Sequence, residues 1–413
     1  MTKQLNSNMN KALSQLVSDA FALRIFSLCD GRDADIRLVG GAVRNALGGW
    51  RRINPISGRA EETDLDFATD MPITDFAALA EEEGLRVYPT GLAHGTVTVS
   101  DGVRQAEVTQ LRSDIDTDGR HATVSFHQNW EADAARRDFT VNAIYLSRDG
   151  TVYDPTGGIA DIQAGRLCFI GKPEDRLAED GLRLLRALRF SAEYPVLNLD
   201  ETAIAALQAA SGMLKRLSAE RIITELRRML AGQGNAEMLT LFSQLGLDRL
   251  ILNGPVAQWV AAPRHNYHLL CEGMRLCALP LQLALIAQDK RMLKSHAGQM
   301  RLSRAEYKML MGAIALADTS HQHADKTELL FTPRWQQGCF WLGELAAFSY
   351  LHLLADRTTG QKIQYDTHRM RQIVHCQAPL LPVTGQDIIT IYTDRVQVLR
   401  GEQIGQILAQ LTQ

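Results

Sequence analysis

Glycines, arginines and paired carboxylates in the first quarter of this chain have the types and spacing that chemistry on phosphates requires. Gly40 and Gly41 are followed by Arg44, and further along Asp64 and Asp66 are separated by one residue. Glycines let backbone amides approach a phosphate closely, and a helix that starts there adds favourable positive charge. Arg44, one turn into that helix, can reach the same anion. The pattern indicates a phosphate-binding turn, or a strand-to-helix turn that needs glycine for its backbone alone.

The two aspartates predict a metal site. Asp64 and Asp66 lie on one face of a predicted strand, because side chains two residues apart in a strand point the same way. Magnesium typically binds one or two carboxylates together with substrate phosphates, and a pair of such ions about 4 Å apart can activate a hydroxyl and stabilise a pyrophosphate leaving group. Glu107, on a predicted neighbouring strand, is placed to add a third carboxylate. Two aspartates spaced in this way are usually a solvated strand face, but the glycine turn and Glu107 favour metal.

A second cluster consists of Arg136, Arg137 and Asp138. Adjacent arginines can contact a triphosphate, and an aspartate beside them can accept hydrogen bonds from ribose hydroxyls. Taken alone, such a triplet is usually a solvated turn, so the interpretation as a nucleotide-binding cluster depends on the other clusters.

A third cluster has a spacing of three residues. Asp180, Arg183, Arg186 and Arg189 form a polar stripe if the segment 177–190 is one helix. A fixed pair of Asp180 and Arg183 would present one acceptor and several donors, which is complementary to the edge of a nucleotide base. An amphipathic helix with salt bridges between residues three apart is the alternative interpretation.

The elements that must position these residues divide the chain into two parts. The first 150 residues predict a mixed α/β domain, with helices over 42–47 and 74–83 and with strands over 36–39, 65–69, 96–100, 106–110 and 122–126. After a turn rich in proline and glycine at 154–158 the pattern becomes helical throughout. Helices are predicted over 177–190, 200–210, 219–230, 238–245, 281–287 and 304–316, and prolines at 333 and 379 mark breaks. The fold class is therefore α+β.

Length and composition describe a protein of several domains without a membrane span. The chain has 413 residues, 46% hydrophobic and 22% charged, so two to four domains are expected. No apolar run approaches the length of a membrane helix, and charged residues interrupt the amino-terminal segment where a secretory signal would lie. Six scattered cysteines fit reduced thiols in the cytoplasm. The formal net charge of −3 argues against bulk attraction to polyanions but allows a local basic groove.

In this order and spacing, the clusters resemble class II tRNA nucleotidyltransferases, also called CCA-adding enzymes, and their relatives the bacterial poly(A) polymerases. The matching segments are 38–44, 64–69, 107–112, 118–122, 136–143, 179–186 and 218–222. The resemblance is strong from about residue 36 to 230 and weak beyond, where 401–405 only loosely matches the family's tail. One position departs from the family: Asn45 follows the arginine where an aspartate is usual, which removes a charge but keeps an acceptor oxygen.

The resemblance implies a head of the DNA polymerase β nucleotidyltransferase type, a mixed sheet with helices, followed by an all-helical neck, body and tail. The implied boundaries are 1–150 for the catalytic head, 151–230 for the neck that recognises the base, 231–325 for the body and 326–413 for a tail that binds tRNA. By similarity, Asp64 and Asp66 would bind catalytic Mg²⁺ with the support of Glu107. The residues that would contact the nucleotide, or place positive charge beside it, are Gly40, Gly41, Arg44, Arg137, Asp138, Asp180, Arg183, Arg186 and Arg189.

The implied activity is the addition of C, C and A to tRNA 3′ ends from CTP and ATP, without a nucleic-acid template. Alternatives are a poly(A) polymerase, an enzyme that adds only CC or only A, and a catalytically idle RNA-binding protein. The segment from 118 to 138 looks like the flexible loop of complete enzymes, which favours all three additions. Unused carboxylates beside RNA phosphates would only repel them, which disfavours the idle protein. Contacts to the tRNA backbone are expected from basic residues of the helical half: Arg291, Lys294, Arg301, Arg304 and Lys308.

Overall fold

The structure, a computed structural model, describes residues 5–51, 59–60, 64–117, 122–126, 129–261 and 267–320. The chain divides into two compact units, Met1–Met229 and Leu230–Gln413. Each unit is described by itself below.

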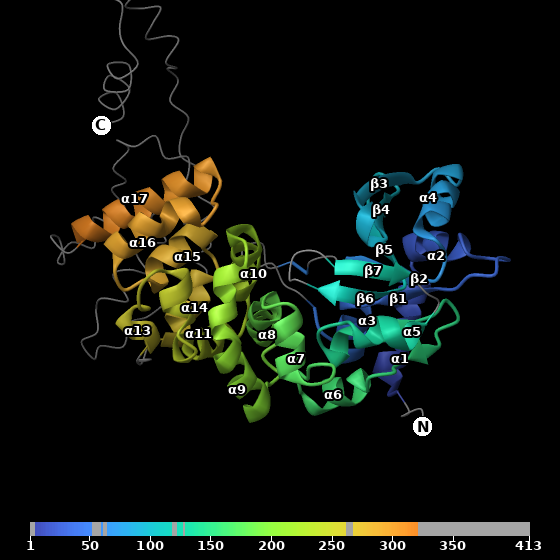
Figure 1. Cartoon of the computed structure of the whole chain (residues 1–413), viewed down its shortest axis with the longest axis horizontal. Coiled ribbons are helices and arrows are strands. Elements are labelled where there is room, and N and C mark those ends of the chain that lie inside the picture. The colour runs from blue at the N-terminus through green and yellow to red at the C-terminus, as the bar shows by residue number, and fades with distance from the viewer. Residues whose placement is uncertain are drawn as a thin grey trace, which may run out of the picture. The chain divides into compact units, whose positions relative to one another are not determined.

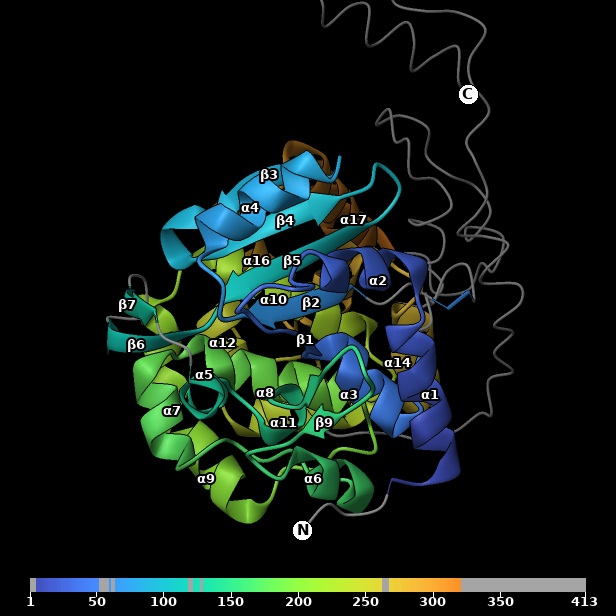
Figure 2. The same ribbon diagram turned by 90° about the vertical axis from the view of Figure 1, so that its right-hand side faces the viewer.

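A seven-stranded mixed sheet forms the centre of the first unit, with the strand order β3-β4-β5-β2-β1-β8-β9 (Figure 2). Strands β2 and β5 pair in parallel, and the other neighbours in the sheet are antiparallel. The strands span β1 Ile36–Val39, β2 Leu65–Thr69, β3 Arg86–Gly91, β4 Thr96–Ser100, β5 Gln105–Gln110, β8 Tyr145–Leu146 and β9 Val152–Tyr153. The predicted strands of the head are confirmed, whereas β3, β8 and β9 were not predicted.

Helices pack against the apolar side chains of this sheet. Helix α4 (Ile73–Glu82) packs on β3, β4 and β5, and α3 (Gly41–Gly48) packs on β1 and β2. Helix α4 lies along the strands β4 and β5 in Figure 2, and Phe67 on β2, Phe76 on α4 and Val108 on β5 are all buried. The amino-terminal helices α1 (Ser7–Val17) and α2 (Ala20–Ser27) begin at Asn6 and Asp19, whose side chains cap the first free amides.

A separate two-stranded hairpin follows the sheet. Strand β6 (Arg112–Thr117) pairs antiparallel with β7 (Ala122–Phe126), and α5 (Trp130–Ala135) comes next. Of the segment 118–138, which was predicted to be a flexible loop, residues 118–121 and 127–128 lie outside the described residues, and the rest includes β7 and α5. Strand β7 was predicted and β6 was not.

The rest of the first unit is helical, but the segment 177–190 is not the single helix that its periodicity predicts. Helix α7 (Pro173–Glu179) ends before Asp180, whose backbone is extended, and α8 (Leu182–Glu193) begins after Gly181. Asp180 Oδ1 accepts a hydrogen bond from the amide of Leu182, so this aspartate stops one helix and supports the start of the next. A Cβ atom on Gly181 would lie 3.1 Å from the Cβ of Met213, which explains the glycine at this break. The remaining helices are α6 Gly158–Ala164, α9 Glu201–Ala210 and α10 Ala219–Ala231.

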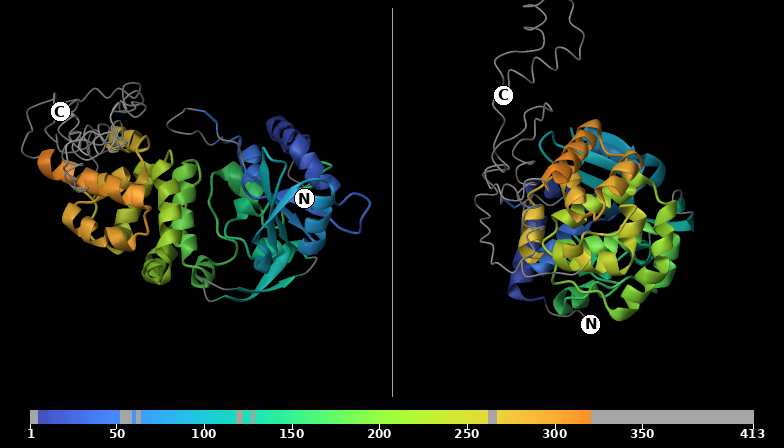
Figure 3. Two further views of the ribbon diagram at one scale, coloured as in Figure 1. Left: turned by 90° about the horizontal axis from the view of Figure 1, so that it is seen from above. Right: turned by 90° about the vertical axis from the view of Figure 1, so that its left-hand side faces the viewer.

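The second unit is helical in its described part, and no strand is assigned there (Figures 1 and 3). Its helices are α11 Asn235–Gln244, α12 Leu247–Ile251, α13 Gln258–Ala261, α14 Tyr267–Met274, α15 Leu279–Ile286, α16 Lys290–His296 and α17 Arg304–Ser320. Every residue of α15 is buried, and α15 packs against α17. The predicted tail over 326–413, with its prolines and the segment 401–405, lies outside the described residues. No helix in the described ranges has the length and apolar character to cross a lipid bilayer.

Candidate active site

The site begins where β1 ends and α3 starts. Gly40 has φ of 74° and ψ of −130°, a backbone conformation that residues with side chains rarely adopt. A Cβ atom at this position would lie 3.2 Å from Oδ2 of Asp66, because Val39 pairs with Asp66 across β1 and β2. Glycine therefore lets the amino-terminal end of α3, with its free amides, come close to this carboxylate.

The three predicted metal carboxylates lie on neighbouring pieces of chain. Asp64 is exposed and comes just before β2, so it is not part of the strand itself. Asp66 is half-buried on β2, and Glu107 on β5 is its register partner in the parallel pair. Glu107 is exposed and is not among the described residues that line the adjacent pocket.

The surroundings of Asp66 disfavour the charged form of its side chain. Burial, the nearby charge of Glu107 and, less strongly, that of Asp64 raise its pKa to about 6, against the opposing effects of Arg137 and Arg44. A bound cation would relieve this repulsion, and hard carboxylate oxygens are suitable ligands for a divalent ion. In the described part of the chain no three acidic, histidine or cysteine side chains form a complete metal cage. The carboxylates therefore fit a divalent ion that takes its remaining ligands from phosphate groups.

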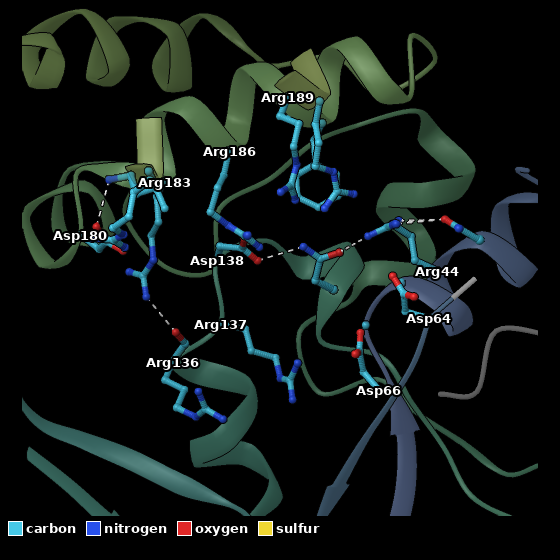
Figure 4. Close-up of a pocket in the computed structure, with 18 of the residues that line it drawn as sticks. Arg44, Asp64, Asp66, Arg136, Arg137, Asp138, Asp180, Arg183, Arg186 and Arg189 are labelled. Atoms are coloured by element: carbon cyan, nitrogen blue, oxygen red, sulfur yellow. Dashed lines mark hydrogen bonds and ion pairs between the residues drawn. The ribbon is translucent and has the colours of Figure 1, made fainter. Parts of the chain in front are cut away.

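A pocket of about 580 Å³ adjoins these carboxylates (Figure 4). Its described lining contains nine arginines and four aspartates, a local excess of positive charge in a chain whose formal net charge is −3. Arg44, Asp64 and Asp66 come from the β1, α3 and β2 side, and Arg183, Arg186 and Arg189 come from α8 (Figure 4). The basic groove that the sequence allows is therefore present in the first unit.

Arg136 and Arg137 are held by one buried carboxylate that the sequence analysis missed. Asp133 on α5 is fully buried and forms ion pairs with both arginines, at 2.5 Å and 3.0 Å, and accepts a hydrogen bond of 2.8 Å from the Tyr145 hydroxyl. Burial alone would raise the pKa of Asp133, but Arg137 and Arg136 outweigh it and lower the pKa to about 2. The signal was present in the sequence: an aspartate three and four residues before two arginines lies on the same helical face.

Asp138 lies in the pocket, where its oxygens already have partners. Oδ1 accepts from the Phe139 amide at 2.8 Å and from Asn142 Nδ2 at 2.9 Å. Oδ2 accepts from Arg186 Nε at 2.7 Å and pairs with its terminal nitrogen at 2.5 Å. Burial would raise the pKa of Asp138, but Arg186 and these hydrogen bonds lower it to about 2.

The predicted side-chain pair between Asp180 and Arg183 is not formed. Asp180 Oδ2 pairs with Arg221 of α10 at 2.6 Å, and Arg183 pairs with Glu179 and donates to the backbone carbonyl of Arg136 at 2.9 Å. The prediction was wrong because it placed Asp180 on the helix, one turn before Arg183, whereas the backbone of Asp180 is extended. Both side chains nevertheless line the pocket.

Arg189 is the most buried arginine of α8. It is 5% exposed and pairs with Glu225 of α10 at 3.0 Å, while its Nε has no hydrogen-bond partner. Burial, together with the nearby charge of Arg186, lowers its pKa to about 10. Glu225 was not predicted as a site residue, and its distance in the sequence from α8 gave no signal.

Arg44 is also buried, and its partners are neutral. Its guanidinium donates to Asn45 Oδ1, to Asn142 Oδ1 at 2.6 Å and to the Tyr194 hydroxyl at 2.6 Å. The acceptor oxygen that Asn45 retains in place of the family's aspartate is therefore used. Tyr194 lies 150 residues away and could not be connected with Arg44 from the sequence.

Comparison with known proteins finds a family model and several relatives that match parts of this chain. Residues 36–168 match the family model described as the poly A polymerase head domain. The mitochondrial CCA tRNA nucleotidyltransferase 1 of Danio rerio is 39% identical over 217 residues, which cover 52% of this chain and 48% of that protein. The protein of the same name from Mus musculus is 29% identical over 386 residues, or 91% of this chain and 82% of the relative.

Among solved structures, the CCA-adding enzyme of Bacillus stearothermophilus has a TM-score of 0.65 at 23% identity, with 98% of this chain and 92% of that chain covered. At this identity the likeness shows the fold. The alignment to the Danio rerio protein spans about half the length of that relative. The chain is thus similar to CCA tRNA nucleotidyltransferases and CCA-adding enzymes, and residues 36–168 match the poly A polymerase head domain.

Proposed function

We propose that this chain is a template-independent tRNA nucleotidyltransferase that adds C, C and A to tRNA 3′ ends from CTP and ATP. The main support for the proposal is that the half-buried carboxylate of Asp66 lies in a pocket whose described lining contains nine arginines. Triphosphate chemistry needs both, since the arginines attract the phosphates and the carboxylates hold a cation beside them. Structures of similar fold are described as CCA-adding enzymes in complex with CTP, with ATP and with tRNA, which supports these three partners.

The pocket suggests a role for each group of residues. Gly40 and Gly41 present backbone amides at the start of α3, and Arg44 and Arg137 face the same space, so we assign these four to the phosphates. Asp180 and Arg183 lie on the α8 side and are assigned to the base edge.

The ribose and the helix arginines complete the assignment. Asp138 is assigned to a ribose hydroxyl, which requires Arg186 to release one of its two contacts with Oδ2. Arg186 and Arg189 supply positive charge beside the bound nucleotide.

In the proposed reaction the 3′ hydroxyl of tRNA attacks the α-phosphate of the nucleotide, and pyrophosphate leaves. Asp64 and Asp66 would hold a divalent ion, Mg²⁺ in our proposal, which when bound neutralises charge on the phosphates and the leaving group. A divalent ion at this position would offset the negative charge that Glu107 and Asp64 place beside Asp66. Arg137 and Arg44 align the triphosphate for in-line attack, and the buried carboxylate of Asp133 fixes Arg137.

The test is an addition assay with a tRNA that lacks its terminal CCA. Purified protein is incubated with labelled CTP, with labelled ATP, and with both, and the products are resolved at single-nucleotide length. We expect two residues from CTP alone and three from the mixture. No addition to tRNA under any of these conditions contradicts the proposal.

Matched variants connect the activity to the site. Asp64→Ala and Asp66→Ala should each abolish addition, because either change removes a ligand for the cation. Asp75→Ala, a change of the same kind at an exposed position on α4, should leave the rate unaltered. Full activity of Asp64→Ala would refute the assigned role of that residue.

Poly(A) addition is the second candidate, because the matching family model is that of the poly A polymerase head domain. The same assay separates the two. Long tails made from ATP alone would favour the polymerase, and a product that stops at CC or gains only A would indicate a partial enzyme.

The division into neck, body and tail and the tRNA-binding surface belong to the same proposal. Arg291, Lys294, Arg301, Arg304 and Lys308, the predicted tRNA contacts, are all exposed on or near α16 and α17. Free cysteines at 29, 168, 271 and 277 are compatible with the proposed cytoplasmic location, although the two animal relatives named above are mitochondrial.

A further inference from the structure

The guanidinium of Arg44 is held by neutral groups only. It is 5% exposed, and Asn45 Oδ1, Asn142 Oδ1 and the Tyr194 hydroxyl accept its hydrogen bonds. The Tyr194 hydroxyl in turn donates to Asn45 Oδ1 at 2.9 Å, which closes a ring of hydrogen bonds. We call these three residues, Asn45, Asn142 and Tyr194, the neutral clamp.

Other arginines of the same pocket are held differently. Arg136 and Arg137 pair with Asp133, Arg186 pairs with Asp138, and Arg189 pairs with Glu225. Each of these carboxylates offsets charge that the pocket would otherwise present. Arg44 forms no ion pair with a carboxylate in the described ranges, so its charge is not neutralised by a direct partner.

Aromatic rings fix the position of the clamp. The Arg44 guanidinium carbon lies 4.6 Å from the centre of the Tyr194 ring and 4.9 Å from that of Phe190. Trp50 also packs against Tyr194, with ring centres 5.0 Å apart. Glycine at position 48 leaves room for this ring, since a Cβ there would lie 2.4 Å from Trp50. Tyr194 is 3% exposed, and its buried hydroxyl accepts from Arg44 and donates to Asn45.

We propose that Tyr194 is a positioning residue, which holds the unpaired charge of Arg44 toward the triphosphate of the nucleotide. The inference rests on the proposed function, since the ligand it names is the nucleoside triphosphate of that reaction. Tyr194 directly follows α8 and Arg44 lies in α3, so the hydroxyl joins the end of a helix of the predicted neck to the predicted phosphate-binding turn of the head. Tyr194 touches Arg44 and no reacting atom, which makes it a positioning residue and not a catalytic one.

The test uses Tyr194→Phe, which removes one oxygen and keeps the buried ring. Binding of CTP and of inorganic triphosphate, each with Mg²⁺ and without tRNA, is measured by calorimetry on the full chain. We expect both affinities to fall by about tenfold, the effect of one hydrogen bond to a charged group. Tyr88→Phe, at an exposed position on β3, is the matched control and should bind both ligands as the wild type does.

A double-mutant cycle shows whether Tyr194 acts through Arg44. In an Arg44→Lys background, Tyr194→Phe should change CTP affinity by less than about twofold, because the guanidinium that the hydroxyl orients is gone. An equal loss in both backgrounds overturns the proposal, and so does a loss for CTP with none for inorganic triphosphate. Unchanged binding by Tyr194→Phe overturns it as well.

These outcomes are separate from the proposed reaction, because no tRNA is present. If the chain binds triphosphate with the predicted dependence on Tyr194 but adds nothing to tRNA, the proposed function is wrong and the role of Tyr194 is supported. If the wild-type chain binds neither CTP nor inorganic triphosphate, both the proposed function and the role of Tyr194 are contradicted.

Discussion

Asp66→Asn should stabilise the protein in the absence of metal, and the gain should grow with pH. Asp66 is half-buried, and burial together with Glu107 and Asp64 raises its pKa from 3.8 to about 6. Asparagine has nearly the same shape and carries no charge. The substitution therefore removes an electrostatic penalty and leaves the packing of β2 in place.

The sign and size follow from the shift in pKa. Below pH 3.8 the aspartate is protonated in the folded and unfolded chain, so the wild type and the variant differ little. As the pH rises toward 6 the unfolded chain loses its proton first, and the wild type loses relative stability until the folded carboxylate has also ionised. A shift of about two units corresponds to an upper limit of about 3 kcal/mol, and contact with water in the open pocket reduces it to about 1–3 kcal/mol.

The measurement is hydrogen exchange in EDTA at pH 4.5 and 7.5, read on peptides from β1, β2 and β5. Exchange reports on the head by itself, which matters because a chain of two compact units need not unfold in one step. Asp75→Asn, on the exposed face of α4, is the control and should show no pH-dependent gain. Addition of Mg²⁺ at pH 7.5 should protect the wild type more than Asp66→Asn. A variant that is less stable than the wild type at pH 7.5, or a gain that is equal at both pH values, would refute the reasoning.

Three further predictions concern other parts of the first unit. Asp133→Asn should lower the free energy of unfolding by about 2–4 kcal/mol at pH 7, because it removes a carboxylate that pairs with two arginines. The depressed pKa of Asp133 gives stability that is present above pH 3.8 and is lost as the pH falls to about 2. Hydrogen exchange of the α5 amides measures this loss of stability. Gly158→Ala should cost about 2 kcal/mol or more in urea unfolding, since its Cβ would lie 2.2 Å from the carbonyl oxygen of Thr140, whereas Gly212→Ala, with open space around it, should change stability by less than about 0.5 kcal/mol. Arg183→Ala should raise the misincorporation ratio of A for C by about tenfold in the addition assay, and unchanged selectivity would count against base recognition by this residue.

Short-range patterns were enough to predict the elements that carry the glycine turn and the predicted metal carboxylates. Strand β1, the turn at Gly40 and helix α3 occupy the predicted positions, as do β2, β4 and β5. Each has a local cause: alternating apolar residues that fill the core, or glycine where the backbone adopts a positive φ. Strands β8 and β9 have two residues each, which is too short for a periodic pattern, so they were not predicted.

Side-chain partners depended on contacts that no local pattern encodes. Arg44 and Tyr194 are 150 residues apart, and Arg189 meets Glu225 from another helix. Asp133 was the exception, because its spacing from two arginines could have been recognised. Residue types therefore predicted which side chains lie in the pocket more successfully than they predicted which side chain pairs with which.

The break at Asp180 shows why that difference matters for function. A continuous helix would have put Asp180 and Arg183 on one face and let them neutralise each other. The extended residue instead sends Asp180 to Arg221, and Arg183 is left to Glu179 and a backbone carbonyl, so the two side chains reach the pocket from separate anchors. Separately anchored groups can hold an acceptor and a donor at a fixed spacing without closing on each other when the pocket is empty. Base selection by this pair, which the Arg183→Ala experiment tests, then depends on the helix break at Asp180 and Gly181 as much as on the two side chains themselves.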